Sequence, residues 1–325
     1  MKSPAPLLPV LVAGLVTIVA GGAMSLQGRA NGLLGPILGH SVFAALVSFI
    51  IGLTLAGTTL LCSPRSRTGA LNLIRLVRTH AMPWWMMLGG LSGGLVVIAQ
   101  ASTVPIMGVA MFTMAFVSGQ VTGGLVVDST RLPPGGKQRL TFFRAFGVLI
   151  VIAALIYGAS ERLTMGVPLW ALLLPFVSGA LTSVQQAFNG RIKAATGSVI
   201  VATTVNFAVG FLALLVAAGV IMFSGVTWAG FPTEPTQWWM LLGGAFGVTF
   251  IGLTALTVAK LGVLLLSLFS LFGNLVGALL LDLLLPTPGS LVSTTTVISA
   301  AMVLLGIAMT IMPSSGNRPG PSPRT

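Results

Sequence analysis

The sequence has very little charge. Its 325 residues include 16 Lys and Arg but only 4 Asp and Glu, so that 6% are charged, against about 25% in an ordinary soluble domain. Apolar residues make up 55% of the chain, and the mean hydropathy is +1.03. Because so few charged side chains cannot cover a water-facing surface, the composition excludes a soluble globular enzyme, a disordered scaffold and a nucleic-acid-binding protein. It predicts an integral membrane protein.

Residues that form disulfides or bind metals are also scarce. The single cysteine, Cys62, excludes an internal disulfide and a multi-cysteine metal site. Two histidines, four acidic residues and this cysteine are too few to suggest a metal-dependent membrane enzyme. We therefore expect no metal and no other cofactor.

What the sequence does contain is ten apolar runs of membrane-spanning length. A bilayer core about 30 Å thick requires about 20 residues of helix. The segment after the last run, Pro313–Thr325, is rich in Pro, Ser and Gly and is predicted to be disordered. The ten predicted helical spans are Leu7–Met24, Ser41–Leu61, Trp84–Thr103, Gly108–Val127, Leu140–Tyr157, Pro168–Ala187, Val199–Phe223, Trp238–Val258, Val263–Leu284 and Ser293–Met312.

The basic residues predict the orientation of these spans. If the N-terminus is cytoplasmic, 13 of the 16 Lys and Arg lie in cytoplasmic segments, whereas the outer gaps contain only Arg29 and Arg162. Lys and Arg concentrate in the cytoplasmic loops of membrane proteins. Both termini are therefore predicted to be cytoplasmic. The net charge of +12 is interpreted first as an insertion signal, with attraction to anionic membrane lipid as a by-product.

The two halves of the sequence repeat each other. At an offset of 158 residues, Gln27 and Asn31 align with Gln185 and Asn189. At an offset of 154 residues, 16 of the 45 positions in residues 84–128 are identical to those in residues 238–282, including a Trp pair, several glycines and an Asp. Each unit contains five spans, so the sequence divides into a first unit, residues 1–160, and a second, residues 161–312.

An odd number of spans predicts that the second unit crosses the membrane upside down. The charges agree, because the gaps after the second and fourth spans are basic and their counterparts after the seventh and ninth contain no Lys or Arg. Inverted repeats of this kind underlie many secondary transporters, in which the substrate site lies between the halves.

Two motifs occur in both halves and suggest a family. The first is Gln-x3-Asn-Gly-x6-Gly with a downstream [Ser/Asn]-Phe-x2-Gly, and the second is Trp-x3-Leu-Gly-Gly-x2-Gly followed by Gly-[Gln/Asn] and Asp. In these motifs the chain resembles the YdcZ-like family of the drug/metabolite transporter (DMT) superfamily, which has the EamA-like fold. The resemblance implies a ten-helix exporter of two fused five-helix units in a bacterial inner membrane, and it implies no particular substrate.

Polar residues within the spans are the candidates for a substrate path. Gln27 and Asn31 are four residues apart, as are Gln185 and Asn189, so each pair shares one helix face. One interpretation is that these amides line a central path for a neutral or zwitterionic solute. The other is that the first and sixth spans end here and the amides bind free backbone groups. The complete predicted lining is Gln27, Asn31, Ser48, Gln100, Gln120, Gln185, Asn189, Asn206 and Asn274.

Three charged residues near the ends of spans are candidates for proton coupling or gating, namely Asp128, Arg144 and Asp282. An ionisable side chain at membrane depth is a functional candidate by default. The alternative is that both acids cap helix ends in water, with Asp128 paired with Arg131 or Arg144. Arg144 would then extend to the membrane interface.

Other motifs favour structural roles. Gly-x3-Gly pairs such as Gly119 and Gly123 are typical of close helix packing, and the Trp pairs are typical of interfacial anchors. Ser92 lies in a Gly-x-Ser-x-Gly sequence, but such a nucleophile needs a base. The only histidines, His40 and His80, fall in predicted loops.

The sequence therefore predicts an all-α, inverted-repeat secondary transporter of small organic solutes that works as a monomer or homodimer. Its expected partners are a small-molecule substrate and membrane lipid, without nucleic acid. The alternatives are a non-transporting membrane scaffold or regulatory subunit and, less favoured, an intramembrane enzyme.

Overall fold

The computed structural model describes residues 7–138, 140–287 and 289–311, and all regular structure in these residues is helical. Met312 and the tail Pro313–Thr325 lie outside the described residues. The helices are α1 (Leu7–Leu38), α2 (Ser41–Cys62), α3 (Pro64–Arg78), η1 (Trp84–Leu88), α4 (Gly89–Asp128), α5 (Phe142–Thr164), α6 (Leu169–Thr196), α7 (Val199–Phe223), η2 (Pro235–Leu242), α8 (Gly243–Leu284) and α9 (Thr294–Ile311).

Seven helical segments of the described chain are long and apolar enough to cross a membrane. This finding confirms an all-helical, multi-pass membrane protein. Their outer surfaces carry many exposed large apolar side chains, such as Leu15, Leu149 and Val216. Exposed apolar side chains of this kind are stable against lipid rather than water.

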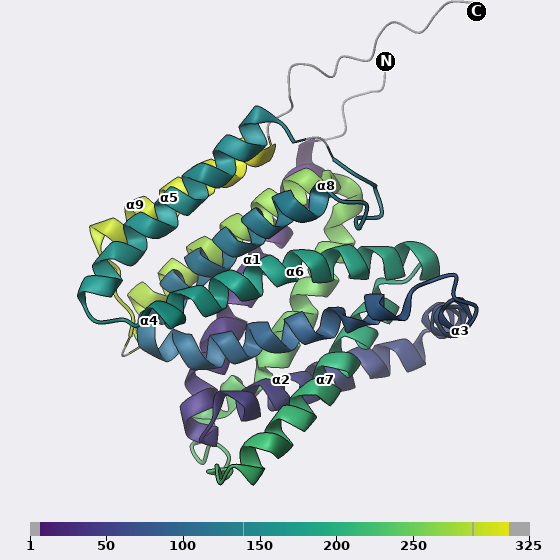
Figure 1. Cartoon of the computed structure of the whole chain (residues 1–325), viewed down its shortest axis with the longest axis horizontal. Helices are drawn as coiled ribbons and strands as arrows, with labels where there is room; N and C mark the ends of the chain where they lie inside the picture. Colours follow the sequence, from purple (N-terminus) through teal and green to yellow (C-terminus); the bar gives the residue numbers. More distant parts are fainter. Residues whose placement is uncertain (1–6, 139, 288, 312–325) are drawn as a thin grey trace, which may run out of the picture.

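Two of the helices each combine two predicted spans. The spans Trp84–Thr103 and Gly108–Val127 form η1 and the single element α4, which bends at Gly108 with φ 79° and ψ 169°. Glycine occupies this conformation without the steric penalty that a side chain would bring. The spans Trp238–Val258 and Val263–Leu284 together form η2 and α8. In Figure 1, α4 and α8 each bend partway along their own length.

Helices α1 and α6 are longer than the sequence predicts. Helix α1 continues from the predicted end at Met24 to Leu38, and α6 continues from Ala187 to Thr196. Asn31 and Asn189 therefore lie inside helices, and the interpretation that their helices end at these residues is wrong. Arg29, which was assigned to an outer gap, lies within α1 and is buried. Polar residues lower the hydropathy of these segments, so the apolar runs end before the helices do.

The sequence does not predict helix α3, because its four arginines indicate a basic cytoplasmic loop. Ser63 caps its first turn by accepting the N–H of Ser66, and Pro64 begins the helix. Gly69 and Leu73 are buried, while the arginines are exposed. Figure 1 shows α3 end-on, so that it runs across the direction of its neighbours. An amphipathic helix with this orientation and charge is typical of the membrane interface.

The remaining helices pair across the two halves of the sequence: α1 packs on α8, α4 on α6, α2 on α7, and α5 on α9 (Figure 1). Glycines permit the closest of these contacts. A Cβ at Gly119 would overlap the carbonyl oxygen of Phe176, and a Cβ at Gly273 would overlap that of Ile18. These contacts confirm that the glycines serve helix packing, as the Gly-x3-Gly pattern predicts.

Candidate substrate site

The first group of predicted site residues forms a closed hydrogen-bonded cluster between α1, α2 and α4. The side-chain amide of Asn31 donates to Oε1 of Gln100 at 2.7 Å, and the hydroxyl of Ser48 donates to Oδ1 of Asn31. Asn31 is 0% exposed, and the other two are also buried. Because both polar atoms of the Asn31 amide are paired, the cluster stabilises the contact between α1 and α4 in an apolar environment.

The corresponding group in the second half is not paired. Asn206 is 7% exposed, and its Oδ1 has no hydrogen-bond partner among the described residues. The same holds for Oε1 of Gln185. Asn189, which aligns with Asn31, lies beside them on α6. These amides lie around an open space instead of bonding to one another.

That space is a cavity of about 170 Å³ between the two halves of the chain. Four of the predicted residues meet there, since its wall includes the amides of Gln27, Gln185, Asn189 and Asn206. Its apolar wall includes Met24, Val96, Val97, Phe49, Phe116, Phe207 and Phe250. No charged side chain is among the described lining residues.

Two of the aromatic residues hold the cavity wall in place. The rings of Phe49 and Phe207, which align at the offset of 158, lie 5.1 Å apart with an interplanar angle of 60°. Each ring packs against a glycine of the other half, Phe49 on Gly210 and Phe207 on Gly52. The repeat contains this signal, but the site predicted from the sequence includes only polar and charged residues.

Three further cavities adjoin the central one on a single side. A cavity of about 370 Å³ shares Gln186 with it, and one of about 210 Å³ shares Asn189. The largest, about 630 Å³, shares Ile251 and extends to Arg65 at the start of α3. All three lie toward the ends of the helices where the basic residues predict the cytoplasm.

On the opposite side α1 and α4 are in contact, and a comparison of equivalent positions shows the difference. Asn31 bonds to Gln100, but the aligned residues Asn189 and Thr254 do not bond to each other and instead line the 210 Å³ cavity. The hydroxyl of Thr254 donates to the carbonyl of Phe250 in its own helix at 2.8 Å. Helices α1 and α4 are therefore in contact where the equivalent parts of α6 and α8 are apart.

Asp282 contributes to the closed side. Its carboxylate accepts the backbone N–H groups of Val109 at 3.0 Å and Ala110 at 2.7 Å, directly after the bend at Gly108. Asp282 is 3% exposed, so the expectation that it caps a helix end in water is wrong. Its bonds join the end of α8 to the free amides at the bend of α4.

Two arginines close to Asp282 reinforce this end of the molecule. Arg162 donates to the carbonyl of Gly289 at 2.9 Å and to that of Leu291 at 2.6 Å. Arg29 donates to the carbonyl of Leu281 at 3.5 Å. Both guanidinium groups are buried, although the sequence placed them in outer loops. Their positive charge partly balances the buried carboxylate.

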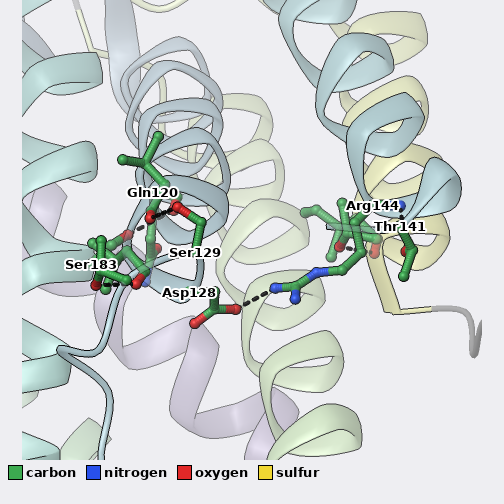
Figure 2. A network of polar contacts seen from close by, with 11 residues as sticks. Gln120, Asp128, Ser129, Thr141, Arg144 and Ser183 are labelled. Carbon is green, nitrogen blue, oxygen red and sulfur yellow. Dashed lines mark hydrogen bonds and ion pairs between the residues drawn. The ribbon is translucent and has the colours of Figure 1, made fainter. Parts of the chain in front are cut away.

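Asp128, which aligns with Asp282, has a different partner. Figure 2 shows Arg144 extending from the first turn of α5 to the carboxylate of Asp128 at the end of α4, and the two form an ion pair. Both side chains are partly exposed and line the 370 Å³ cavity. The pairing of Asp128 with Arg144 was one of the two considered from the sequence.

Gln120 and Asn274 lie outside the central cavity. The hydroxyl of Ser183 donates to the backbone carbonyl of Gln120 at 2.7 Å (Figure 2), and the aligned hydroxyl of Ser25 donates to that of Asn274. The side chain of Asn274 also accepts from Ser25 at 3.0 Å and is buried. These residues hold helix pairs together, although Gln120 also lines the 370 Å³ cavity.

The Gly-x-Ser-x-Gly sequence does not form a nucleophile turn. Ser92 lies inside α4 and is 8% exposed. His40 precedes α2, where its Nδ1 accepts the N–H of Val42 as a helix cap. In the part of the chain that the structure describes, no group of three His, Cys, Asp or Glu residues could hold a metal ion.

Comparison with known families places the chain. Residues 12–157 and, separately, residues 170–309 match the family model described as "Putative inner membrane exporter, YdcZ". No curated protein sequence matches the chain. The two matches cover most of the sequence and correspond to its two halves. The chain therefore belongs to the YdcZ family of DMT-type inner-membrane exporters.

Proposed function

We propose that the protein is a secondary transporter that exports small organic metabolites or drugs by alternating access. In this proposal it consists of two inverted five-helix units, residues 1–160 and 161–312, with ten crossings and both termini in the cytoplasm. The observation that carries the proposal is the central cavity between the halves, which adjoins further cavities on one side, while on the other side Asn31 of α1 is bonded to Gln100 of α4.

The lengths of α4 and α8 support ten crossings. The 40 residues of α4 would extend about 60 Å as a straight helix, twice the thickness of a bilayer core. The bend at Gly108 allows α4 to cross the membrane twice. Helix α8, with 42 residues, has a similar length. Together with α1, α2, α5, α6, α7 and α9, these two helices supply ten crossings.

Paired contacts support an inverted repeat. The contact of Gly119 with Phe176 has its counterpart in that of Gly273 with Ile18, at the offsets of 154 and 158 residues. The bond from Ser183 to Gln120 likewise corresponds to the bond from Ser25 to Asn274. Contacts that recur at both offsets are what two similar units produce when a two-fold axis relates them.

The differences between the halves support alternating access. If the contact between Asn31 and Gln100 opened while Asn189 and Thr254 approached each other, the cavities would open on the opposite side. The two units would then have exchanged conformations, as in other inverted-repeat transporters. A solute that binds one of the two arrangements more tightly than the other would shift the population toward it.

Transport by purified protein in liposomes tests this function. We expect radiolabelled solutes from a panel of small uncharged and zwitterionic compounds to exchange across the membrane faster than in protein-free liposomes. The control is Gly35→Cys with Ala101→Cys in a Cys62→Ser background. A Cβ at Gly35 would lie 3.3 Å from that of Ala101 and 2.9 Å from its carbonyl oxygen, so a small separation of α1 and α4 brings the two Cβ atoms to the distance of about 3.5–4.5 Å found in disulfides.

Oxidation of this control should lock α1 to α4 and stop the exchange, and reduction should restore it. If no solute in the panel exchanges faster than in the oxidised control, the transport proposal is wrong and a scaffold or regulatory role replaces it.

A further inference from the structure

The central cavity has chemical features that limit what it binds. We propose that its ligand is a planar, uncharged molecule bearing an adjacent hydrogen-bond donor and acceptor, such as a carboxamide or lactam on an aromatic ring. That such a molecule is transported rests on the proposed function. That it binds in the cavity does not, because binding is measured separately.

The amides provide the first argument. Oε1 of Gln185 and Oδ1 of Asn206 are buried without partners among the described residues, and Gln27 and Asn189 add two more carboxamides to the same wall. A buried polar group without a partner is costly. A side-chain carboxamide offers a donor and an acceptor side by side, and its best partner carries the complementary pair, as in recognition of adenine by Asn and Gln.

The aromatic residues provide the second argument. Phe49 and Phe207 contact each other across the cavity wall, and Phe116 and Phe250 also line it. Rings favour offset or edge-to-face contact with another ring. The volume of about 170 Å³ also fits a single ring, since a cavity of about 150 Å³ holds benzene.

The absence of charge provides the third argument. None of the described lining residues is charged. The nearest ion pair, Asp128 with Arg144, lines the adjoining 370 Å³ cavity, and its charges already neutralise each other. An ionised ligand would therefore lose its hydration without gaining a counter-charge. A neutral ligand avoids this cost.

Three probes of nearly equal size isolate the effect of charge: benzamide, benzoate and benzylammonium. Each is titrated against the purified full-length protein while the thermal unfolding midpoint is measured, because a ligand that binds only the folded state raises it by mass action. We expect benzamide to raise the midpoint progressively with its concentration. The same shift should require a benzamide concentration at least tenfold lower than that of either charged probe.

Two variants test whether the shift arises at this site. Asn206→Leu and, independently, Gln185→Leu remove a carboxamide with little change in size, and each should raise the benzamide concentration needed at least tenfold. The control is Gln138→Leu, the same kind of change at an exposed residue outside the helices, which should leave the titration unchanged. If one site variant does not fold, the other gives the result.

The inference is overturned if benzoate or benzylammonium binds as tightly as benzamide, if benzamide causes no shift, or if neither site variant weakens it. These outcomes are distinct from failure of the proposed function. Selective binding of benzamide by a protein that transports no solute would support the site and overturn transport. Transport of other solutes without benzamide binding would overturn only this inference.

Discussion

The amide of Asn31 on α1 donates a 2.7 Å hydrogen bond to Gln100 on α4, 69 residues further along the chain. Ser48 donates to the other side of the same amide, so Asn31 connects three helices. The bond joins α1 to α4 on the side away from the three adjoining cavities. Thr254 occupies the position equivalent to Gln100 in the second half, so the same bond between an asparagine and a glutamine has no counterpart there.

Replacing Asn31 by leucine should therefore destabilise the protein. The change leaves Gln100 and Ser48 buried without their partner, which costs about 1–3 kcal/mol for each unsatisfied group. We expect a lower thermal unfolding midpoint in detergent for Asn31→Leu than for Gln100→Leu, which leaves the bond from Ser48 in place. Gln138→Leu is the control on the surface. Equal midpoints for Asn31→Leu and the control would contradict the role assigned to the cluster.

The glycines at helix contacts should not tolerate alanine. In Gly119→Ala and Gly273→Ala, the added methyl group would overlap a backbone carbonyl of the facing helix. Overpacking of this kind costs about 1–3 kcal/mol. The matched controls are Gly57→Ala and Gly219→Ala, where a Cβ would meet no atom within 4 Å.

Because alanine stabilises a helix by about 0.5–1 kcal/mol relative to glycine, the controls should unfold at the same or a higher temperature. Thermal unfolding of the four proteins measures this contrast. If all four unfold alike, the close helix contacts are not important for stability.

The sequence predicted most of the helices because membrane spans have a simple signature. The predicted span Val199–Phe223 has the same bounds as α7, since Ser198 caps its start and an apolar run fills its length. The signature failed where polar residues occur inside a helix, as with Arg29 in α1. Their burial is stabilised by partners on other helices, which a reading of one segment does not include.

The site was predicted only in part. The repeat identified Gln27, Gln185, Asn189 and Asn206, which line one cavity. It could not identify the bond between Asn31 and Gln100, because Gln100 aligns with a threonine. Asp282 bonds to backbone groups that become free only because α4 bends at Gly108, and that geometry depends on the folded chain rather than on residue type.

The two aligned aspartates should respond differently to neutralisation. The two carboxylate oxygens of Asp282 accept the N–H groups of Val109 and Ala110, and Asp282→Asn removes one of these two acceptors. A hydrogen bond to a charged group contributes about 1.5–3 kcal/mol to stability. Asp128→Asn breaks only a partly exposed ion pair, which contributes about 0–1 kcal/mol.

The buried Met107 at the bend provides the measurement. In a Cys62→Ser background, Met107→Cys should react with a maleimide roughly tenfold faster or more when Asp282→Asn is added. Adding Asp128→Asn should change the rate little. An equal effect of the two changes would show that Asp282 does not hold the bend closed.

The orientation in the membrane can be tested with the native cysteine. Cys62 is exposed at the end of α2, on the side that the basic residues place in the cytoplasm. A membrane-impermeant maleimide should label it only in permeabilised cells. In a Cys62→Ser background, Glu234→Cys should be labelled in intact cells, because the sequence places Glu234 on the outer side. Labelling of both residues under the same condition would contradict the inverted arrangement.

Engineered disulfides should trap the two ends of the cavity separately. In a Cys62→Ser background, Gly35→Cys with Ala101→Cys should form a disulfide readily, because α1 and α4 are in contact there. Asn189→Cys with Thr254→Cys should form one only when α6 approaches α8, since the 210 Å³ cavity separates them in this structure. Gel mobility after oxidation measures both yields.

A solute that favours the alternative state should lower the first yield and raise the second, because the two contacts exclude each other. If a solute that the protein transports changes neither yield, the two ends do not open and close in alternation and alternating access is wrong.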